Sequence, residues 1–351
     1  MAIDTINKLP QALLPWYESI KRDLPWRQDR EPYHVWLSEI MLQQTRVEAV
    51  KGYYTRFLNV LPTIEALASC DDDQLHKLWE GLGYYSRVRN LQKAARIVCE
   101  QYGGQLPGDL AALKKLPGIG DYTAGAIASI GFGIPAPAVD GNVLRVFARL
   151  YNDEGDIMQP AVKAATTQKV MAQQPAEAPG DFNQALMELG ALVCTPGQPD
   201  CAACPLQALC LGCQSGNPAR LPQKAPKKAR KKCELTLCLA QDAAGRWLLQ
   251  KRGEQGVLAG LWQPPVLAEE ALDEKKALAA AQKLLPAAVL LKEKPLKAKH
   301  IFTHLEWHMT AYVMAAPCTP PPEGCVWASP AQLEQEYTLP GAFKTLRKRM
   351  L

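Results

Sequence analysis

Long apolar stretches are missing from this sequence of 351 residues. No run of about eighteen consecutive apolar residues occurs, although a helix needs roughly that length to span a bilayer. The N-terminus also lacks the basic flank and apolar core of an exported precursor. We therefore expect a protein of the cytoplasm that has no membrane partner.

A strong excess of either charge is missing as well. The 40 basic and 35 acidic residues give a formal net charge of +5 at pH 7. Seven of the basic residues fall in the stretch 216–232, which contains no acidic residue. Outside that stretch 33 basic residues stand against 35 acidic ones, so the overall charge does not by itself predict a nucleic-acid partner. Any such prediction depends on motifs.

The sequence also lacks internal repeats, and its length is sufficient for two domains. From Leu9 to about Gly190 the apolar residues recur at helical spacing, interrupted by Gly and Pro turns, which predicts a mostly α-helical domain over residues 1–215. The Pro, Gly and basic composition of residues 216–232 predicts an extended linker.

After Cys233 the pattern changes to short alternating segments. Residues 234–242 and 246–252 are typical of two strands joined by a turn, and residues 307–315 of another strand. Residues 269–285 have the composition of a helix. We therefore expect an α+β domain over residues 233–351.

Eleven cysteines without an export signal indicate reduced thiols, and clustered thiols then hold metal more often than they form disulfides. Four thiolates within seventeen residues can surround one compact centre, which is either tetrahedral zinc or an iron-sulfur cluster. The spacing C-x6-C-x2-C-x5-C alone leaves both open. The four are Cys194, Cys201, Cys204 and Cys210.

A Gly-Ile-Gly turn follows Leu116 and Pro117. Gly118 and Gly120 permit a tight turn, and the free amides at the start of the next helix can hold an anion such as a duplex phosphate. Taken alone, a turn of this kind between helices is most often only structural.

Two carboxylates have distinctive surroundings. Asp140 precedes a helix with an apolar stripe and is expected to be its N-cap. Glu39 has Val35, Trp36 and Leu42 on its side of a predicted helix, so desolvation should raise its pKa and let it hold a proton at neutral pH. The alternative is a solvated surface glutamate, and Arg46, two turns on, would favour the charged form.

The cysteine spacing after an all-helical domain resembles the cluster loop of the endonuclease III-like helix-hairpin-helix superfamily of DNA glycosylases. The resemblance covers most of residues 1–213. It implies a 4Fe-4S cluster on the four cysteines, with Cys213 not a ligand, and a hairpin at Gly118 and Gly120 that docks on the DNA backbone without reading sequence. It also implies that Asp140 is the catalytic aspartate, whose charge stabilises the oxocarbenium-like transition state.

The segment 36–45, WLSEIMLQQT, resembles the signature of the adenine-specific mismatch (MutY) branch of that superfamily. In that branch the glutamate matching Glu39 protonates adenine at N7, because the adenine anion is a poor leaving group. Bifunctional members have a lysine at the position of Tyr122, where it forms a Schiff base and cleaves the strand. Tyrosine favours simple hydrolysis, although it could also be only a packing residue.

The target adenine must be flipped out of the base stack, and the gap must be propped open. The resemblance assigns propping to Gln44 and Tyr84, and it places Trp26 and Arg27 near the adenine pocket. Judged from the residues alone, Tyr84 and Trp26 would more often be core aromatics and Gln44 a surface residue.

The C-terminal domain resembles the Nudix-like domain of the same branch. The glutamate-rich box of the pyrophosphatases is missing after Gly260, so we expect this domain to bind rather than catalyse. Phe302, Thr303 and His304 resemble the Phe-Ser-His loop that reads 8-oxoguanine, with Thr in place of Ser. His304 could equally be an ordinary strand or turn histidine.

We therefore predict a monomeric, monofunctional DNA glycosylase. It would hydrolyse the N-glycosidic bond of adenine opposite 8-oxoguanine or guanine in double-stranded DNA, and in a bacterium it would be associated with the nucleoid. The alternatives are an endonuclease III-like pyrimidine glycosylase/lyase, which Tyr122 and Glu39 oppose, and a non-catalytic iron-sulfur DNA-binding protein, which leaves an acid on an apolar face unexplained. The missing glutamate-rich box argues against a third alternative, a Nudix nucleotide hydrolase.

Overall fold

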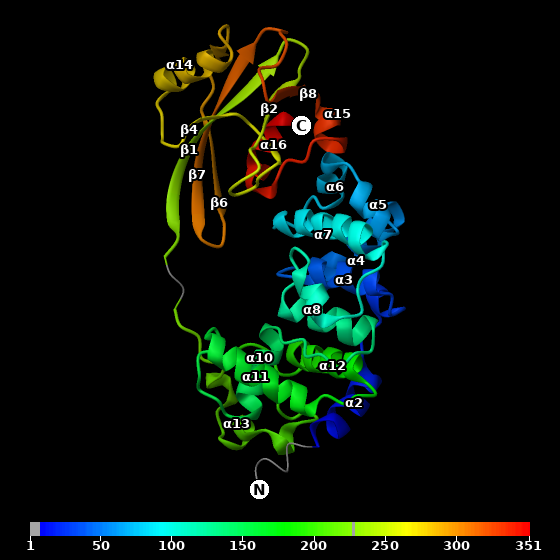
Figure 1. Ribbon diagram of the computed structural model, residues 1–351. Helices are drawn as coiled ribbons and strands as arrows, with labels where there is room; N and C mark the ends of the chain where they lie inside the picture. Colours follow the sequence, from blue (N-terminus) through cyan, green and yellow to red (C-terminus); the bar gives the residue numbers. More distant parts are fainter. Residues whose placement is uncertain (1–7, 227–228) are drawn as a thin grey trace. The chain divides into compact units, whose positions relative to one another are not determined.

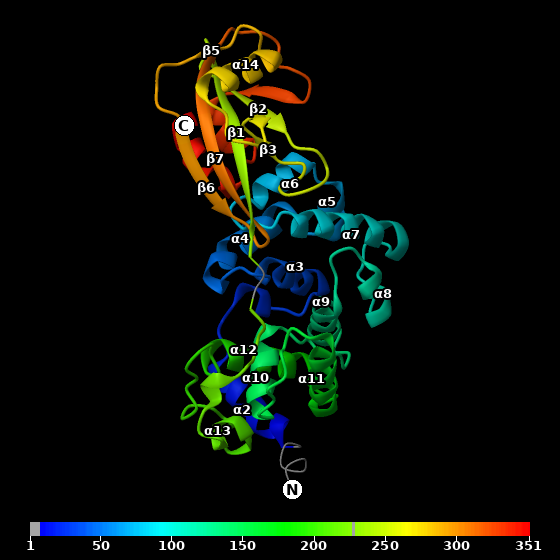
Figure 2. The ribbon, with the colours of Figure 1, turned by 90° about the vertical axis from the view of Figure 1, so that its left-hand side faces the viewer.

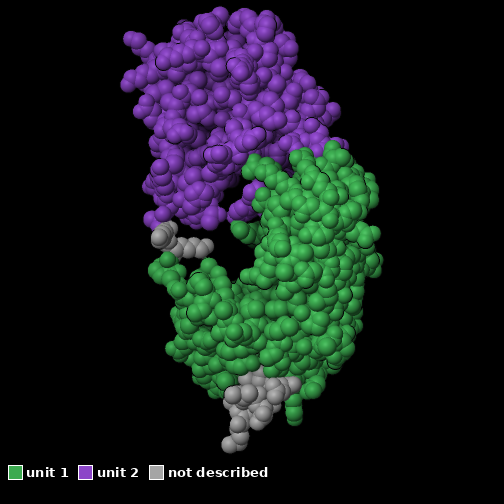
Figure 3. Space-filling view, viewed as in Figure 1, with its two compact units in different colours: residues 1–69, 89–226 green, residues 70–88, 227–351 purple. Residues whose placement is uncertain are grey.

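The computed structural model describes residues 8–226 and 229–351. The chain divides into two compact units, shown in green and purple in Figure 3. The first contains residues up to Ser69 together with Arg89–Pro226, and the second contains Cys70–Val88 together with the C-terminal residues. The second unit therefore includes a segment that the sequence analysis placed in the helical domain.

The first unit is helical, and its described residues contain no strand longer than an isolated bridge, in agreement with the sequence analysis (Figures 1 and 2). Helix α7 begins in the second unit and continues into the first. The helices are α2 (Leu9–Ile20), α3 (Pro32–Leu42), α4 (Val47–Val60), α5 (Ile64–Ser69), α7 (Ser86–Tyr102), α8 (Leu110–Lys115), α9 (Asp121–Ala126), α10 (Gly141–Leu150), α11 (Pro160–Gln173), α12 (Pro179–Leu192) and α13 (Leu211–Gln214).

Two kinds of helix build this unit. Helix α10 has one apolar stripe, and Val143 and Phe147 in that stripe pack with Leu13 of α2 and Phe182 of α12 in one core. Helix α3 is apolar around most of its circumference and is therefore buried on nearly all sides, from Tyr33 to Met41 apart from His34. This buried helix carries Glu39.

A close backbone contact positions the loop that leads to Asp140. Helix α9 continues into a π-helical turn at Ile127–Gly131. A Cβ atom on Gly125 of α9 would lie 2.0 Å from the carbonyl oxygen of Pro137, so no larger residue fits there without a shift of the backbone. Glycine thus lets the loop before Asp140 lie directly against α9.

The first part of the predicted linker 216–232 is held against the helical unit. The buried Arg149 donates from Nε to the carbonyl oxygens of Pro218 and Leu221, at 2.9 and 3.0 Å. The amide of Ile157 donates to the carbonyl oxygen of Gln223 at 3.2 Å. The bonds from Arg149 satisfy a buried guanidinium, and composition alone could not reveal any of these contacts. Residues 227 and 228 lie outside the described residues.

The second unit is α+β, as the sequence analysis expected. Its centre is a parallel pair of twelve-residue strands, β1 (Lys231–Asp242) and β7 (Leu305–Ala316). The other strands are β2 (Trp247–Lys251), β3 (Trp262–Gln263), β4 (Val266–Ala268), β5 (Val289–Leu290), β6 (Leu296–Ile301) and β8 (Cys325–Ala328). The strand order in the sheet is β3-β2-β1-β7-β5, and in addition β4 pairs with β1, β6 with β7 and β8 with β2.

Alternating residues of the sheet pack into two cores. Leu237 and Leu239 face a core with Phe343 and Leu346, next to the C-terminal helix, whereas Cys238 faces a core that includes residues of α14. The helices of this unit are α6 (Asp72–Leu78), α14 (Glu274–Leu284), α15 (Pro330–Gln335) and α16 (Lys344–Met350). None of the described helices is both long and apolar enough to cross a membrane.

Candidate active site

A cavity of about 690 Å³ lies within the first unit, between α3, the turn before α9, the start of α10, and α12. Most of the residues predicted to form the site line it together. They are Trp26, Arg27, Glu39, Gln44, Gly118, Gly120, Tyr122 and Asp140. Tyr84, by contrast, belongs to the second unit.

Glu39 is a buried acid, with only 7% of its surface exposed. Its pKa is raised to about 7, mainly by burial and to a smaller extent by the nearby carboxyl of Asp140, while a hydrogen bond from Tyr122 and the charge of Arg27 oppose the rise. The carboxyl is therefore partly protonated at neutral pH. This agrees with the expectation from the apolar face of α3.

The cation that lowers the pKa of Glu39 is Arg27, not Arg46 as the sequence analysis assumed. Helix α3 ends at Leu42, and Arg46 follows a left-handed residue, Gln44, as the N-cap of α4. The two-turn spacing from Glu39 to Arg46 therefore does not exist as a helical spacing.

Tyr122, on α9, donates its phenolic hydrogen to Glu39 Oε2 across 2.5 Å. Its hydroxyl also lies 3.6 Å from the sulfur of Met187 on α12. Burial, together with the Glu39 and Asp140 carboxyls, raises the pKa of Tyr122 well above its ordinary value. The phenol therefore stays protonated and fixes the position of one carboxyl oxygen.

Asp140 is the N-cap of α10, as predicted. Its Oδ1 accepts from the amides of Asn142 and Val143 at 2.9 and 2.8 Å, and Oδ2 accepts from Asn142 Nδ2 at 2.8 Å. Burial raises the pKa of Asp140, and these hydrogen bonds limit that rise. Both carboxylate oxygens are thus oriented by donors that favour the charged form.

Asp140 is linked by hydrogen bonds to the cysteine-rich loop. Arg145 Nη2 donates to Asn142 Oδ1 and to the carbonyl oxygen of Gly190, both at 2.8 Å. The same side chain donates from Nε to the carbonyl oxygen of Cys194 at 2.8 Å. The position of Asp140 therefore depends on the backbone of the cysteine loop.

Asn183, on α12, holds the other side of the Asp140 loop and is fully buried. Its Nδ2 donates to Ser129 Oγ and to the carbonyl oxygen of Ala136, both at 2.8 Å, and its Oδ1 accepts from the amide of Ala138 at 3.2 Å. The bonds to Ala136 and Ala138 hold the chain just before Asp140, and the bond to Ser129 joins Asn183 to the π-helical turn.

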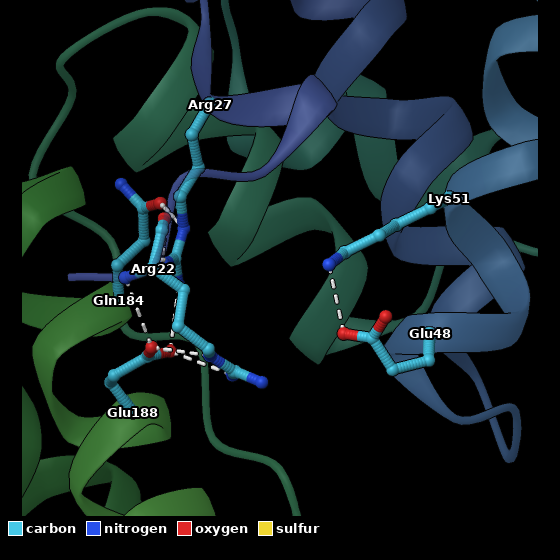
Figure 4. Close-up of polar contacts among 6 residues, drawn as sticks. All are labelled: Arg22, Arg27, Glu48, Lys51, Gln184 and Glu188. Carbon is cyan, nitrogen blue, oxygen red and sulfur yellow. Dashed lines mark hydrogen bonds and ion pairs between the residues drawn. The ribbon is translucent and has the colours of Figure 1, made fainter.

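A second buried carboxylate, Glu188 of α12, pairs with two arginines at the cavity wall (Figure 4). Arg22 donates to both of its oxygens, at 2.6 and 2.9 Å, and Arg27 Nη2 donates at 2.9 Å. Arg27 Nε also donates to Gln184 Oε1 at 3.1 Å. Burial raises the pKa of Glu188, but these two arginines outweigh that effect and lower it below its ordinary value.

The Gly-Ile-Gly turn has the geometry of a helical hairpin between α8 and α9. Gly118 has a φ of 79°, and a Cβ atom there would lie 2.8 Å from Cβ of Asn90. Gly120 is the N-cap of α9. Gly118 therefore needs to be glycine for both conformation and space.

Gln44 and Tyr84 share an uncommon backbone conformation. Their φ angles are 58° and 49°, in the left-handed region that residues other than glycine rarely adopt. Both are exposed, and 47% of the Tyr84 surface is accessible. Tyr84 is therefore not the core aromatic that its residue type would suggest.

The four predicted metal ligands converge on one space. Cys194, Cys201, Cys204 and Cys210 line a cavity of about 30 Å³, which Cys213 also reaches. Burial, together with the other three thiols, raises the pKa of Cys204 to about 12, although a backbone hydrogen bond opposes that rise. Among the described residues no group of three or more His, Cys, Asp or Glu side chains has the geometry of a single-ion metal site.

Phe302, Thr303 and His304 form the turn between β6 and β7 in the second unit. Thr303 and His304 are exposed, whereas the Phe302 ring is half-buried and packs edge-on against Trp307, with ring centroids 4.8 Å apart. The amide of Phe302 donates to the carbonyl oxygen of Leu305 at 2.8 Å. The turn thus presents its last two side chains to solvent.

Comparison with known proteins identifies both halves of the chain. Residues 37–172 match the model of the HhH-GPD superfamily of base excision DNA repair proteins, and residues 236–349 match that of the NUDIX domain. The human adenine DNA glycosylase is 38% identical over 403 aligned residues, an alignment that covers 97% of this chain and 72% of the human protein.

The chain belongs to the adenine DNA glycosylase family. It is a DNA glycosylase of base excision repair.

Solved structures agree with this assignment for the helical part of the glycosylase. A thermostable thymine-DNA glycosylase superposes with a TM-score of 0.57 at 29% identity, covering 61% of this chain and all of that structure. Endonuclease III in a non-covalent DNA complex superposes with a TM-score of 0.52 at 24% identity, covering 61% of this chain and 97% of that one, and so shares the fold.

Sequence reasoning missed the buried polar residues that support the glycosylase cavity. They are Arg145, Asn183 and Glu188, together with the half-buried Asn142. A local signal exists for Asn142 and Arg145, since they follow shortly after Asp140 and are three residues apart, a helical spacing. For Asn183 and Glu188 the only signal is a polar residue within the apolar pattern of α12.

Proposed function

We propose that this glycosylase removes adenine by hydrolysis from duplex DNA in which the adenine lies opposite 8-oxoguanine or guanine. One observation carries the proposal: a buried glutamic acid with a pKa of about 7 lies in the same cavity as a carboxylate held by hydrogen bonds. A proton donor and an anion are what the departure of a purine base from deoxyribose requires.

In this mechanism Glu39 donates its proton to N7 of the flipped adenine, and the electron pair of the glycosidic bond moves to adenine N9. The charge of Asp140 stabilises the positive sugar carbon that forms. Water adds to that carbon, and its proton passes to the Glu39 carboxylate, which restores the acid. Tyr122 holds Glu39 in position throughout.

The same cavity favours a monofunctional enzyme. A Schiff base with the sugar requires an amine, and residue 122 is instead a phenol bonded to Glu39. No lysine lines the cavity among the described residues. The product is therefore an abasic site in an uncut strand.

We propose that the DNA is held by several parts of the chain. The amides near Gly118 and Gly120 contact the backbone, Trp26 and Arg27 contact the adenine, and the exposed left-handed residues Gln44 and Tyr84 prop the opened pair.

We assign the reading of the partner base to the turn of Phe302, Thr303 and His304. The exposure of Thr303 and His304 supports this, and the packing of Phe302 on Trp307 suits a supporting role for that ring. Residues 1–215 would then form the excision domain, 216–232 the connection, and 233–351 the recognition domain. We expect the enzyme to act as a monomer, in a bacterium at the nucleoid.

We also propose that Cys194, Cys201, Cys204 and Cys210 hold a 4Fe-4S cluster. Four sulfur donors around one space fit such a cluster. Arg149 Nη1 donates to Cys194 Sγ at 3.4 Å, and the amide of Cys213 donates to Cys210 Sγ at 3.4 Å. When bound, the cluster would cross-link the loop that supports Arg145.

The function is tested with four duplexes that carry adenine opposite 8-oxoguanine, guanine, cytosine or thymine. We expect alkali-labile abasic sites with the first two partners and little product with the others. Strand cleavage without alkali, or a covalent complex trapped efficiently by borohydride, would instead indicate a lyase. Release of a pyrimidine from a damaged pair would refute adenine specificity.

A further inference from the structure

Helix α6 and the turn that follows it belong to the C-terminal unit. Residues Cys70–Val88 group with the C-terminal residues, although they lie more than 130 positions earlier in the chain (Figure 3, purple). Two groups of contacts join them, and each is centred on an acidic side chain: Asp73 in α6 and Glu80 just after its end.

The first point is Asp73, in the first turn of α6. Its Oδ1 accepts from Trp262 Nε1 at 3.1 Å, and its carboxylate pairs with Lys251 Nζ at 3.4 Å. The Lys251 ammonium also lies over the Trp262 ring, 5.3 Å from its centroid. Trp262 is buried, so its indole hydrogen depends on Asp73 for this bond.

The second point is Glu80, seven residues further on. Its Oε1 accepts from Arg347 Nη1 of α16 at 2.7 Å, and its Oε2 pairs with Lys77 Nζ at 2.7 Å. Both Lys77 and Arg347 also donate to the carbonyl oxygen of Leu333. The side chains of this network are only 18% to 25% exposed, so its hydrogen bonds are partly shielded from water.

The same segment builds the turn that carries Tyr84. Trp79 Nε1 donates to the carbonyl oxygen of Gly83 at 3.1 Å. Arg87 Nη2 donates to the carbonyl oxygens of Leu82 and Gly83, both at 3.0 Å, and its guanidinium lies over the Trp79 and Tyr84 rings. Trp79, directly after α6, and Arg87 of α7 therefore support the turn that carries the exposed Tyr84 ring.

We propose that the Asp73 and Glu80 contacts form a latch by which the C-terminal domain positions Tyr84 in the opened base pair. The inference rests on the proposed function, since it takes Tyr84 as the propping residue and the C-terminal domain as the reader of the partner base. Asp73, Glu80 and Arg347 are positioning residues, because they act through the Tyr84 turn. Recognition of the partner base and opening of the pair are thus carried by residues of one compact unit.

The test compares Arg347→Met with Arg349→Met in the full chain. Arg349 lies on the same helix, and its pair with Glu293 joins two side chains that are 41% and 36% exposed. For Arg347→Met we expect the ratio of single-turnover excision rates, 8-oxoguanine over guanine partner, to fall by about tenfold. We also expect less fluorescence from a 2-aminopurine placed beside the target adenine, because the pair is opened less. Arg349→Met should keep both values of the wild type.

A double-mutant cycle separates the latch from a general loss of stability. If Arg347 acts through Tyr84, then Tyr84→Ala should remove most of the effect of Arg347→Met on the ratio, so the two effects are not additive. The exchange Glu80→Arg with Arg347→Glu should restore part of the ratio. Glu80→Gln provides a milder variant if thermal denaturation shows that Arg347→Met is poorly folded.

The outcomes are distinguishable. Additive effects of Tyr84→Ala and Arg347→Met, or unchanged ratio and fluorescence in Arg347→Met and Glu80→Gln, would overturn the latch while leaving adenine excision intact. If the wild type releases no adenine from either partner, the proposed function fails and the latch fails with it.

Discussion

At the scale of single residues, the candidate site depends on two carboxyl groups whose surroundings differ. Glu39 is buried on an otherwise apolar helix, and this burial favours its protonated form more strongly than the single hydrogen bond from Tyr122 opposes it. Asp140 has three donors on its two oxygens, which favour its charged form. The environments, not the residue types, thus separate the acid from the anion.

The first prediction concerns the acid. Glu39→Gln keeps the shape of the side chain but cannot donate a proton to the leaving base, so the single-turnover excision rate should fall by about 10²- to 10⁴-fold. Binding to the mismatched duplex, measured by fluorescence anisotropy, should remain close to that of the wild type. Glu48→Gln, at an exposed glutamate of α4 that pairs with Lys51 (Figure 4), is the matched control and should change neither value. A near-normal excision rate for Glu39→Gln would show that Glu39 is not the proton donor and has only a structural role.

The second prediction concerns the pH dependence of stability. The folded pKa of Glu39, about 7, lies above the ordinary value of 4.5 that we assign to the unfolded chain. As pH rises from 4.5 to 7 the unfolded chain ionises first, so this residue lowers the free energy of unfolding, by about 3 kcal/mol once both states are ionised. At pH 8 Glu39→Gln should therefore be more stable than the wild type in urea denaturation, whereas at pH 4 the two should converge. Equal stability at both pH values would contradict the raised pKa.

Part of this site could be predicted from the sequence because the relevant information is local. The apolar face around Glu39 and the cap at Asp140 follow from helical spacing, and both are present in the structure. The phenol on Glu39 comes from 83 residues further along, and no local pattern predicts such a pair. The wrong assignment of Arg46 has a similar cause, since the end of α3 depends on the left-handed residue Gln44 rather than on composition.

At the scale of elements, the loop between α9 and α10 determines where Asp140 lies. Gly125 lets the loop approach α9, Asn183 bonds its backbone, and Arg145 connects the start of α10 to the carbonyl of Cys194. The sequence predicted the helices on either side but not these contacts, because each joins segments that are distant along the chain. The bonds that hold residues 218–223 to the helical unit were missed for the same reason.

The third prediction tests the loop. Asn183→Ala removes three buried hydrogen bonds and leaves the amide of Ala138 without its Asn183 partner, which costs about 1–3 kcal/mol, whereas the carbonyl oxygen of Ala136 keeps its bond from Gln174 Nε2. We expect the midpoint of thermal unfolding to fall by several degrees and adenine excision to slow, since Asp140 follows directly. Asn59→Ala, at an exposed position of α4, is the control. An unchanged excision rate in a destabilised variant would show that Asn183 supports the fold but not Asp140.

The fourth prediction concerns the cysteine loop. Anaerobically purified protein should be yellow-brown and contain about four irons per chain, because its four converging thiols match an iron-sulfur ligand set. Replacing Cys201 with Ser should reduce the iron content and the affinity for duplex DNA, whereas Cys318→Ser, at an exposed cysteine of the second unit, should change neither. Stoichiometric zinc without iron, measured by elemental analysis, would support the zinc alternative.

At the scale of the whole molecule, the two units do not follow the order of the chain. The C-terminal domain contains α6 from the N-terminal half, so a cut in the linker does not separate two independent bodies. Sequence patterning predicted a change from helices to strands near residue 233, which the structure confirms. It could not predict the position of α6, because the acidic residues that anchor that helix resemble solvated surface charges.

The last prediction follows from this division. A chain that ends at Ala225 keeps every residue that lines the cavity, so it should still release adenine opposite guanine. Release should be slower, because Asp73 has lost Trp262 and Glu80 has lost Arg347. It should also unfold at a lower temperature and lose its preference for 8-oxoguanine. The full-length variant His304→Ala separates these effects. Its ratio of excision rates, 8-oxoguanine over guanine partner, should fall by about one to two powers of ten, because a contact to the partner base is lost. Its unfolding temperature should equal that of the wild type. If truncation leaves the ratio of 8-oxoguanine to guanine substrates intact, the C-terminal domain has a role other than reading the partner base.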